Sequence, residues 1–436
     1  MIKRKFHIFV VSFILTLILP FSVQAEESPS IAELIEKAEP GDVVELENRL
    51  YEEDVVIDKA ITLVGKEDTT IKGSGTGDVV TLDANGIVLE NIRITGSGTV
   101  LDHDHAGVKI LSDDTIVKNT IIDDSLHGIY VKASKGNILQ NNVIKGKTDL
   151  NPSRRGNGIH LFHSSYIEIL DNTITDARDG IYFSFANHSF IEGNKISKTR
   201  YGLHYMYSDY NEFYRNEFYE NTGGAAIMYS DFIRLEENQF YDHHELQSFG
   251  VLFQTANDVE MKNNVIRFNQ KGIFMDQSNR NMIKNNQVTN NRVALDIWSS
   301  SIDNVFTGNH FIDNILQYTS DGGKDLNNWN DGKVGNAWSD HLFIDLDEDG
   351  ISDGVYQYTS AFGDVLVREQ LGVLFLDSPA LALYENWNEL LNPNDVKISD
   401  DRAIHVATST GGMHYFLPVV TVLILLVILR RNRREA

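Results

Sequence analysis

The sequence contains no cysteine, which excludes disulfides, thiolate metal sites and thiol nucleophiles together. A soft metal would therefore need methionine and histidine as its ligands. Basic residues are also scarce, because 38 Lys and Arg stand against 62 Asp and Glu, a formal charge of -24. Since binding to phosphates requires a basic surface, this deficit excludes nucleic acid as a partner. With only 7 prolines and 42% hydrophobic residues, the chain is expected to be folded.

The chain contains a sequence repeat with a period of 22 residues. One motif of the repeat begins with an asparagine, at Asn172, Asn194, Asn216 and Asn238. A second motif begins with a glycine followed by an apolar residue, at Gly158, Gly180 and Gly202. A coil of roughly 22 residues holds three short strands and three turns, the size of one rung of a parallel β-helix. The repeat therefore predicts an all-β fold, a right-handed parallel β-helix of the pectin-lyase type, over residues 43–334.

The repeated asparagine has a structural role in this interpretation. Asparagine tolerates the left-handed conformation of a tight turn and can hydrogen-bond to its copy in the next rung. Two steps exceed the period, Asn142 to Asn172 and Asn238 to Asn264. The extra residues, near 149–155 and 243–247, are expected to form loops.

The N-terminal residues 1–25 read as an export signal, with basic residues, an apolar core and a small-residue cleavage site at Ala25. An uncleaved anchor is the alternative. Residues 26–42 follow as an N-terminal cap helix, in which Ser30 and Glu33 have capping-box spacing. Such a helix would shield the edge of the first rung.

The 22-residue repeat ends before the C-terminal part of the chain. Residues 335–400 are interpreted as a C-terminal cap that contains an acidic loop, a strand at 373–376 and a short helix begun by Ser378 and Pro379. Residues 413–429 are almost wholly apolar and precede four arginines, which predicts a transmembrane helix and an extracytoplasmic body anchored by its C-terminus. The alternative is a buried core helix, which would leave the arginines unexplained.

Candidate metal ligands come from the outward positions of the Gly-Ile strand. Side chains alternate along a strand, so Ile181 and Phe183 point inward while Tyr182 and Ser184 face solvent. The period places these residues in the same outward row: Tyr130, His160, Tyr182, His204, Leu252, Phe274 and Asp296. The neighbouring row contains Met206, on which Met228 should stack. We expect His160, His204, Met206 and Met228 to form a copper(I) site or a docking patch, because thioether and imidazole favour copper(I). The alternative is that a loop or the C-terminal segment covers the patch and its residues are only packed.

A second candidate site lies in the acidic loop. Asp345, Asp347, Asp349 and Asp353 alternate around Gly350, as a calcium loop requires, and Ile351 would contribute its carbonyl oxygen. Tyr356 stands where an EF-hand has its bidentate glutamate, so a shorter calcium loop is predicted. A plain acidic turn is the alternative.

Many parallel β-helices degrade polysaccharides, a reaction that requires an acid and a base on one wall. The acidic pairs Asp113-Asp114 and Asp123-Asp124 are available, but nothing places a carboxylate and a base on one wall. A cell-surface polysaccharide lyase or uronate epimerase therefore remains the alternative function.

The order of several motifs over nearly the whole exported chain resembles the NosD family. The motifs are Val79-Val-Thr-Leu82, Gly335-Asn-Ala-Trp338-Ser-Asp340, Asp345-Leu-Asp-Glu-Asp-Gly-Ile-Ser-Asp353 and Ser378-Pro-Ala380. One departure is Val355, where the family pattern often has proline.

The resemblance implies a non-catalytic accessory protein that helps to load copper into nitrous oxide reductase. It further implies an ABC transporter's ATPase and membrane subunits, a copper chaperone lipoprotein and the reductase as partners. The family motifs mark the fold better than a metal site, and they do not identify the copper ligands.

Overall fold

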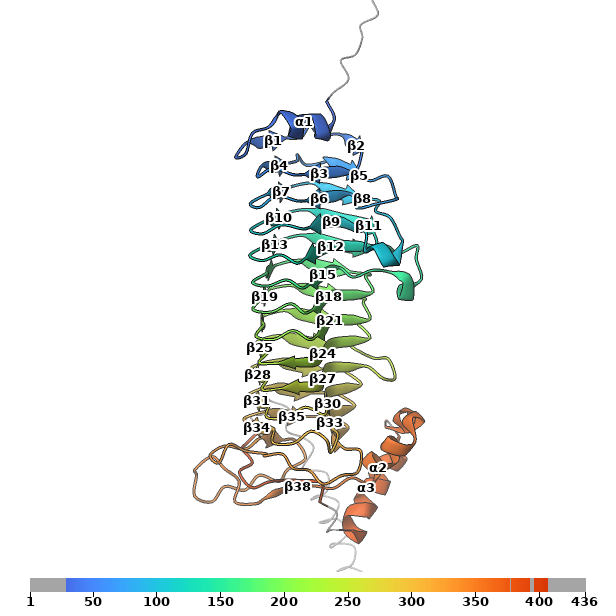
Figure 1. Ribbon diagram of the computed structural model, residues 1–436. Coiled ribbons are helices and arrows are strands. Elements are labelled where there is room, and N and C mark those ends of the chain that lie inside the picture. Colours follow the sequence, from blue (N-terminus) through green and yellow to red (C-terminus); the bar gives the residue numbers. More distant parts are fainter. Residues whose placement is uncertain (1–28, 377, 393–395, 407–436) are drawn as a thin grey trace, which may run out of the picture.

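The computed structural model describes residues 29–376, 378–392 and 396–406, and most of them form a column of stacked coils (Figure 1). Each coil contributes one short strand to each of three sheets, in which all neighbouring strands are parallel and sequence neighbours never pair. This is the parallel β-helix that the repeat predicted. Strands about 4.8 Å apart bring equivalent residues of successive coils into register.

Sheet A has twelve strands: β1 (Val43–Glu45), β4 (Thr62–Val64), β7 (Val88–Glu90), β10 (Ile116–Lys118), β13 (Ile138–Gln140), β16 (Glu168–Leu170), β19 (Phe190–Glu192), β22 (Glu212–Tyr214), β25 (Arg234–Glu236), β28 (Glu260–Lys262), β31 (Met282–Lys284) and β34 (Val305–Thr307). Sheet B has thirteen: β2 (Leu50–Glu52), β5 (Thr70–Lys72), β8 (Arg93–Thr95), β11 (Ile121–Ser125), β14 (Val143–Gly146), β17 (Thr173–Thr175), β20 (Lys195–Ser197), β23 (Glu217–Tyr219), β26 (Gln239–Tyr241), β29 (Val265–Arg267), β32 (Gln287–Thr289), β35 (His310–Ile312) and β37 (Ala337–Trp338). Sheet C has twelve: β3 (Val55–Ile57), β6 (Val80–Leu82), β9 (Ala106–Ile110), β12 (His127–Lys132), β15 (Ile159–Phe162), β18 (Asp179–Ser184), β21 (Tyr201–Met206), β24 (Gly223–Asp231), β27 (Phe249–Asn257), β30 (Lys271–Asp276), β33 (Val293–Ile297) and β36 (Leu316–Thr319).

The core is a stack of inward side chains, one set per coil. Ile181, Leu203 and Ala225 follow one another along sheet C with no exposed surface. Phe218 and Phe240 stack in parallel on sheet B, with ring centroids 5.1 Å apart. The repeated glycine in the sheet C strands leaves no room for a side chain, because a Cβ at Gly180 would lie 2.4 Å from the carbonyl oxygen of Gly202.

The predicted asparagine ladder is present between sheets A and B. The Asn216 side-chain oxygen accepts hydrogen bonds from the backbone and side-chain nitrogens of Asn194. The Asn194 side-chain oxygen accepts the same two hydrogen bonds from Asn172. The left-handed residue is the one before the ladder asparagine, for example Arg215 (φ 51°), so the expectation that the asparagine itself takes this conformation is wrong. The ladder continues to Asn336, so the coils run past the predicted end at residue 334 and include β37.

Short helices lie at both ends of the column (Figure 1). Helix α1 (Ile31–Lys37) begins at Ser30, whose hydroxyl accepts a hydrogen bond from the Glu33 amide, and it buries Ile31 and Ile35. At the other end lie α2 (Ala361–Arg368), the 3-10 helix η3 (Gln370–Phe375) and α3 (Pro379–Leu391). The strand predicted at 373–376 is therefore wrong, whereas α3 begins after Ser378 as predicted. Strands β38 (Tyr356–Tyr358) and β39 (Ile398–Asp400) pair antiparallel.

The two predicted membrane-related segments, residues 1–25 and 413–429, lie outside the described residues. Within the described part of the chain, no helix is long and apolar enough to cross a membrane.

Candidate functional site

The outward side of sheet C, here called the sheet C wall, has the rows of side chains that the period predicted. One row pairs coil by coil from Tyr130 to Asp296, as follows: Tyr130, His160, Tyr182, His204, Ala226, Leu252, Phe274 and Asp296. The neighbouring row runs Phe162, Ser184, Met206, Met228, Gln254 and Asp276. Met228 pairs with Met206 as expected.

The expectation that this row faces solvent is wrong for most of the row, because Ala226, Leu252 and Asp296 are buried in its later coils and its first two residues are buried as well. Tyr130 is only 2% exposed and His160 only 9%. The segment before β9, with the 3-10 helix η1 (Leu101–His103), lies against the wall here, and the Tyr130 hydroxyl donates a hydrogen bond to Asp104 (3.3 Å). His127 Nε2 lies 3.8 Å from the other Asp104 oxygen. The alternative of a patch partly covered by a loop therefore applies to this part of the wall.

His160 occupies the centre of an aromatic stack. Its ring centroid lies 4.7 Å from that of Tyr130, 4.7 Å from that of Tyr182 and 5.3 Å from that of His127. Neither ring nitrogen has a hydrogen-bond partner among the described residues. Burial lowers the pKa of His160 to about 3, so the imidazole is neutral at physiological pH. A buried neutral imidazole with both nitrogens unpaired is unusual, because such groups normally find a partner.

His204 is held by a carboxylate. Its Nδ1 lies 2.9 Å from Asp179 Oδ2, and Arg200 forms a bidentate pair with the same carboxylate at 2.8 and 2.6 Å. Burial acts to raise the pKa of Asp179, but the hydrogen bonds from His204 and Arg200 outweigh it and keep that pKa below its ordinary value. When the neutral imidazole donates its Nδ1 proton to this carboxylate, Nε2 is the ring nitrogen that can bind a metal. Histidines that bind metals commonly have this carboxylate partner.

The two thioethers follow on the next row. The Tyr182 hydroxyl lies 3.7 Å from Met206 Sδ, within range of a weak hydrogen bond. Met228 packs against a small apolar cluster of Ala226, Phe249 and Leu252. The structure thus brings His204, Met206 and Met228 onto two adjacent strands. His160 lies two coils from His204, with the Tyr182 ring between them, so it does not join this group.

The acidic loop brings together three of its five predicted residues. Carboxylate oxygens of Asp345, Asp347 and Asp349 all lie within 4.8 Å of one another. Asp353 instead accepts a hydrogen bond from the Leu346 amide (2.7 Å), and Ile351 forms a bridge with Ile404.

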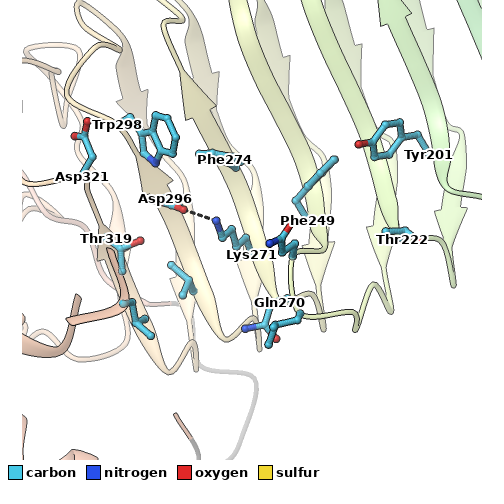
Figure 2. Close-up of a pocket in the computed structure, with 14 residues that line it drawn as sticks. Tyr201, Thr222, Phe249, Gln270, Lys271, Phe274, Asp296, Trp298, Thr319 and Asp321 are labelled. Atoms are coloured by element: carbon cyan, nitrogen blue, oxygen red, sulfur yellow. Dashed lines mark ion pairs between the residues drawn. The ribbon is translucent and has the colours of Figure 1, made fainter. Parts of the chain in front are cut away.

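A pocket with a volume of about 410 Å³ opens on the later coils of the wall (Figure 2). The loop between β26 and β27, with Leu246, contributes one side of it, and Leu366 of α2 contributes another. Inside it, Lys271 Nζ pairs with Asp296 Oδ2 at 2.7 Å. Phe274 and Trp298 meet edge to face beside this pair, with ring centroids 5.4 Å apart.

Sequence reasoning missed several residues of the wall. Asp179 has the same parity as the inward Ile181 and Phe183, so strict alternation hid it, although its carboxylate reaches His204. Arg200 stands 22 residues after Arg178 at a turn and gave no separate signal. His127 lies two residues before Ile129 in its strand, and alternation hid it in the same way. The pocket depends on α2 and on an insertion loop, whose packing the repeat does not predict.

Comparisons with known proteins agree with this architecture. Residues 144–342 match the family model "Periplasmic copper-binding protein (NosD)", and residues 56–165 match that of a right-handed β-helix region, which agrees with the predicted hand. The catalytic unit of a thermostable alpha-1,3-glucanase from Streptomyces thermodiastaticus superposes with a TM-score of 0.53 at 14% identity over 72% of this chain and 66% of that one. The Dettilon tailspike protein superposes with a TM-score of 0.52 at 16% identity over 65% of this chain and 63% of that one. These two likenesses show the fold alone.

Two curated relatives are similar over most of their length. The "Probable ABC transporter binding protein NosD" of Pseudomonas aeruginosa is 32% identical over 349 residues, which cover 76% of this chain and 81% of the relative. The protein of the same name from Stutzerimonas stutzeri is 30% identical over 384 residues, which cover 84% and 87%. With its β-helix, its motif order and these two relatives, the chain belongs to the NosD family of periplasmic copper-binding proteins.

Proposed function

We propose that the chain is a non-catalytic, extracytoplasmic accessory protein that works with an ABC transporter and delivers copper to, or docks, nitrous oxide reductase during its maturation. The description of the NosD family as periplasmic copper-binding proteins supports copper as the cargo. The two relatives are named as ABC transporter binding proteins, which supports a transporter as a partner. The reductase, a copper chaperone lipoprotein and the transporter's ATPase and membrane subunits are the partners of this proposal. Residues 1–25 would direct export, and residues 413–429 would anchor the body to the membrane.

Copper(I) is the cargo, and His204, Met206 and Met228 are its principal ligands in this proposal. The observation that carries it is an imidazole oriented by Asp179 beside two thioethers stacked in register on one wall. Imidazole and thioether donors suit copper(I) and not calcium or magnesium. His160, whose ring nitrogens have no hydrogen-bond partner among the described residues, is a further candidate copper ligand on the same wall.

A competitive copper(I) titration of the full chain tests the cargo site. Replacing Met206 and Met228 together with leucine removes both thioethers while keeping apolar side chains, and we expect copper(I) affinity to fall at least tenfold. Met282→Leu is the control, because this methionine is solvent-exposed and lies on sheet A, away from the proposed ligands. Unchanged affinity in the double variant would refute the assignment of these ligands.

A deletion strain tests the role in maturation. Without this chain, the reductase should accumulate with little copper, and restoring the gene should restore the copper content. A fully loaded reductase in the deletion strain would contradict the proposal. Incubating the full chain with uronate polymers tests the alternative enzyme, and we expect neither unsaturated nor epimerised products.

Calcium in the acidic loop is a separate, structural part of the proposal. Asp345 Oδ1 is buried without a hydrogen-bond partner among the described residues, and the Asp347 and Asp349 oxygens lie close to it. A buried carboxylate oxygen without a partner is costly, so a cation would stabilise it. Oxygen donors of this kind are those that calcium prefers.

A further inference from the structure

The pocket on the later coils is separate in its chemistry from the proposed copper ligands. Its fourteen described lining residues include no histidine or methionine. Its volume, about 410 Å³, falls within the range of roughly 300–1,000 Å³ that small-molecule sites occupy. The sheet forms its floor, while an insertion loop and α2 form its sides (Figure 2). It is therefore a built concavity on a rigid sheet.

A buried amide without a partner lines this pocket. Gln270 is only 5% exposed, and its side-chain Nε2 has no hydrogen-bond partner among the described residues. Leaving a buried donor unpaired destabilises a protein, so an acceptor on a ligand would stabilise this site. The next residue, Lys271, has further N–H groups beyond the one that meets Asp296.

Both hydrogen-bond donors and hydrogen-bond acceptors line the pocket. Gln270 and Lys271 donate, whereas Asp296 and Asp321 offer carboxylate oxygens. Asp321 already accepts a hydrogen bond from the Ser299 amide (2.7 Å), which fixes its position. A ligand with several hydroxyl groups fits this floor, since each hydroxyl can both donate and accept.

Aromatic rings supply the apolar side of the site. Phe274 and Trp298 lie together next to the ion pair, and Phe249 and Tyr201 continue the aromatic surface toward His204. The Trp298 side chain is 38% exposed, so part of its ring is open to a ligand. Flat aromatic faces pack well against the C–H face of a sugar ring, while the ring's hydroxyls reach polar neighbours.

The charged side chains of the pocket distinguish neutral sugars from anionic ones. The lining contains one lysine and two aspartates, and the lysine is already matched by Asp296. The pocket is thus net acidic on a chain of formal charge -24, and an anionic sugar would be repelled. We infer that this pocket binds an uncharged oligosaccharide, through stacking on Trp298 and hydrogen bonds to Gln270, Lys271 and Asp296. This inference is independent of the copper proposal.

Tryptophan fluorescence and calorimetry on the full chain test the inference. The probes are a tetramer of N-acetylglucosamine, maltotetraose and tetragalacturonate. We expect at least one neutral probe to bind and to change the fluorescence, and tetragalacturonate to bind at least tenfold more weakly. Trp298→Phe should remove most of the fluorescence change, and Gln270→Leu should weaken binding by about tenfold, since one buried hydrogen bond is worth roughly that factor.

Trp387→Phe is the matched control, because this tryptophan lies on α3 and is not among the lining residues. It should leave both the binding and the fluorescence change intact. The thermal unfolding midpoint of Trp298→Phe should match that of the wild type, which shows that the variant is folded. Failure of both neutral probes to bind, or binding unaffected by both pocket variants, would overturn the inference.

Discussion

Replacing Asn216 with alanine tests the asparagine ladder most directly. The Asn216 side chain has no exposed surface and takes part in four hydrogen bonds. Its oxygen accepts from the backbone and side-chain nitrogens of Asn194 (3.0 and 2.9 Å). Its nitrogen donates to the carbonyl oxygen of Ile191 (3.0 Å) and to the side-chain oxygen of Asn238 (2.9 Å).

The cost of the substitution can be worked out bond by bond. The Asn194 side chain keeps its bonds to two backbone carbonyls, and Asn238 keeps the bond from the Asn216 backbone amide. The groups that lose a partner are the Asn194 backbone amide and the Ile191 carbonyl. A stranded buried donor costs about 1–3 kcal/mol and a lost hydrogen bond about 1 kcal/mol. We therefore expect Asn216→Ala to lower the free energy of unfolding by about 3 kcal/mol.

Denaturant unfolding and hydrogen exchange provide the assay. Coils contact mainly their neighbours, so the loss should first appear as local opening around Asn194, whose amide should exchange faster. Asn48→Ala is the control, because Asn48 is exposed in the first coil and its replacement should change stability by less than about 0.5 kcal/mol. If Asn216→Ala unfolds like the wild type and the Asn194 amide stays protected, the ladder does not stabilise the column as described.

Four further outcomes are expected. His160→Phe should leave stability unchanged or raise it in thermal unfolding, because both ring nitrogens lack partners in the described part of the chain, and a large loss of stability would indicate a hydrogen bond that this part does not contain. Burial lowers the pKa of His243 and of His160 to about 3 from an unfolded value of 6.5, so only the unfolded state gains these protons as the pH falls. Stability should therefore drop below pH 6.5, by about 2 kcal/mol for each histidine at pH 5, and a flat profile between pH 7 and 5 would contradict this. Asp179→Asn should weaken copper(I) binding about 10–100-fold by releasing His204, and equal affinity in a copper titration would count against that role. Asp349→Ala should abolish a calcium heat in isothermal titration that Asp68→Ala retains, and calcium binding equal to wild type would leave the loop a plain acidic turn.

The sequence predicted the fold because one physical rule repeats. A period of 22 residues fixed the stacking of Tyr182 on His160 and of Met228 on Met206, and the pairing is as expected. The same rule could not reveal what covers the wall. Asp104 reaches Tyr130 from a segment outside the regular coil, so that tyrosine is buried where the pattern predicted exposure.

The candidate site was only partly predictable for a similar reason. Strand alternation and the 22-residue period predict the positions of His204, Met206 and Met228. They do not predict the hydrogen bond between His204 and Asp179, because it joins side chains of different coils. The pocket depends on Leu366 of α2, which packs on the last coils through long-range contacts that no local pattern encodes.

The ladder asparagines also bear on how such a chain can change over generations. Asn194, Asn216 and Asn238 make equivalent contacts with the next coil, so one 22-residue unit can replace or follow another without altering the fit. The insertion after Asp242 extends one coil by four residues, and the following asparagine, Asn264, still meets Asn238. Selection for folding therefore acts on the amides and the inward side chains. The outward side chains are left to change coil by coil, so a binding surface can diversify while the column that supports it stays the same.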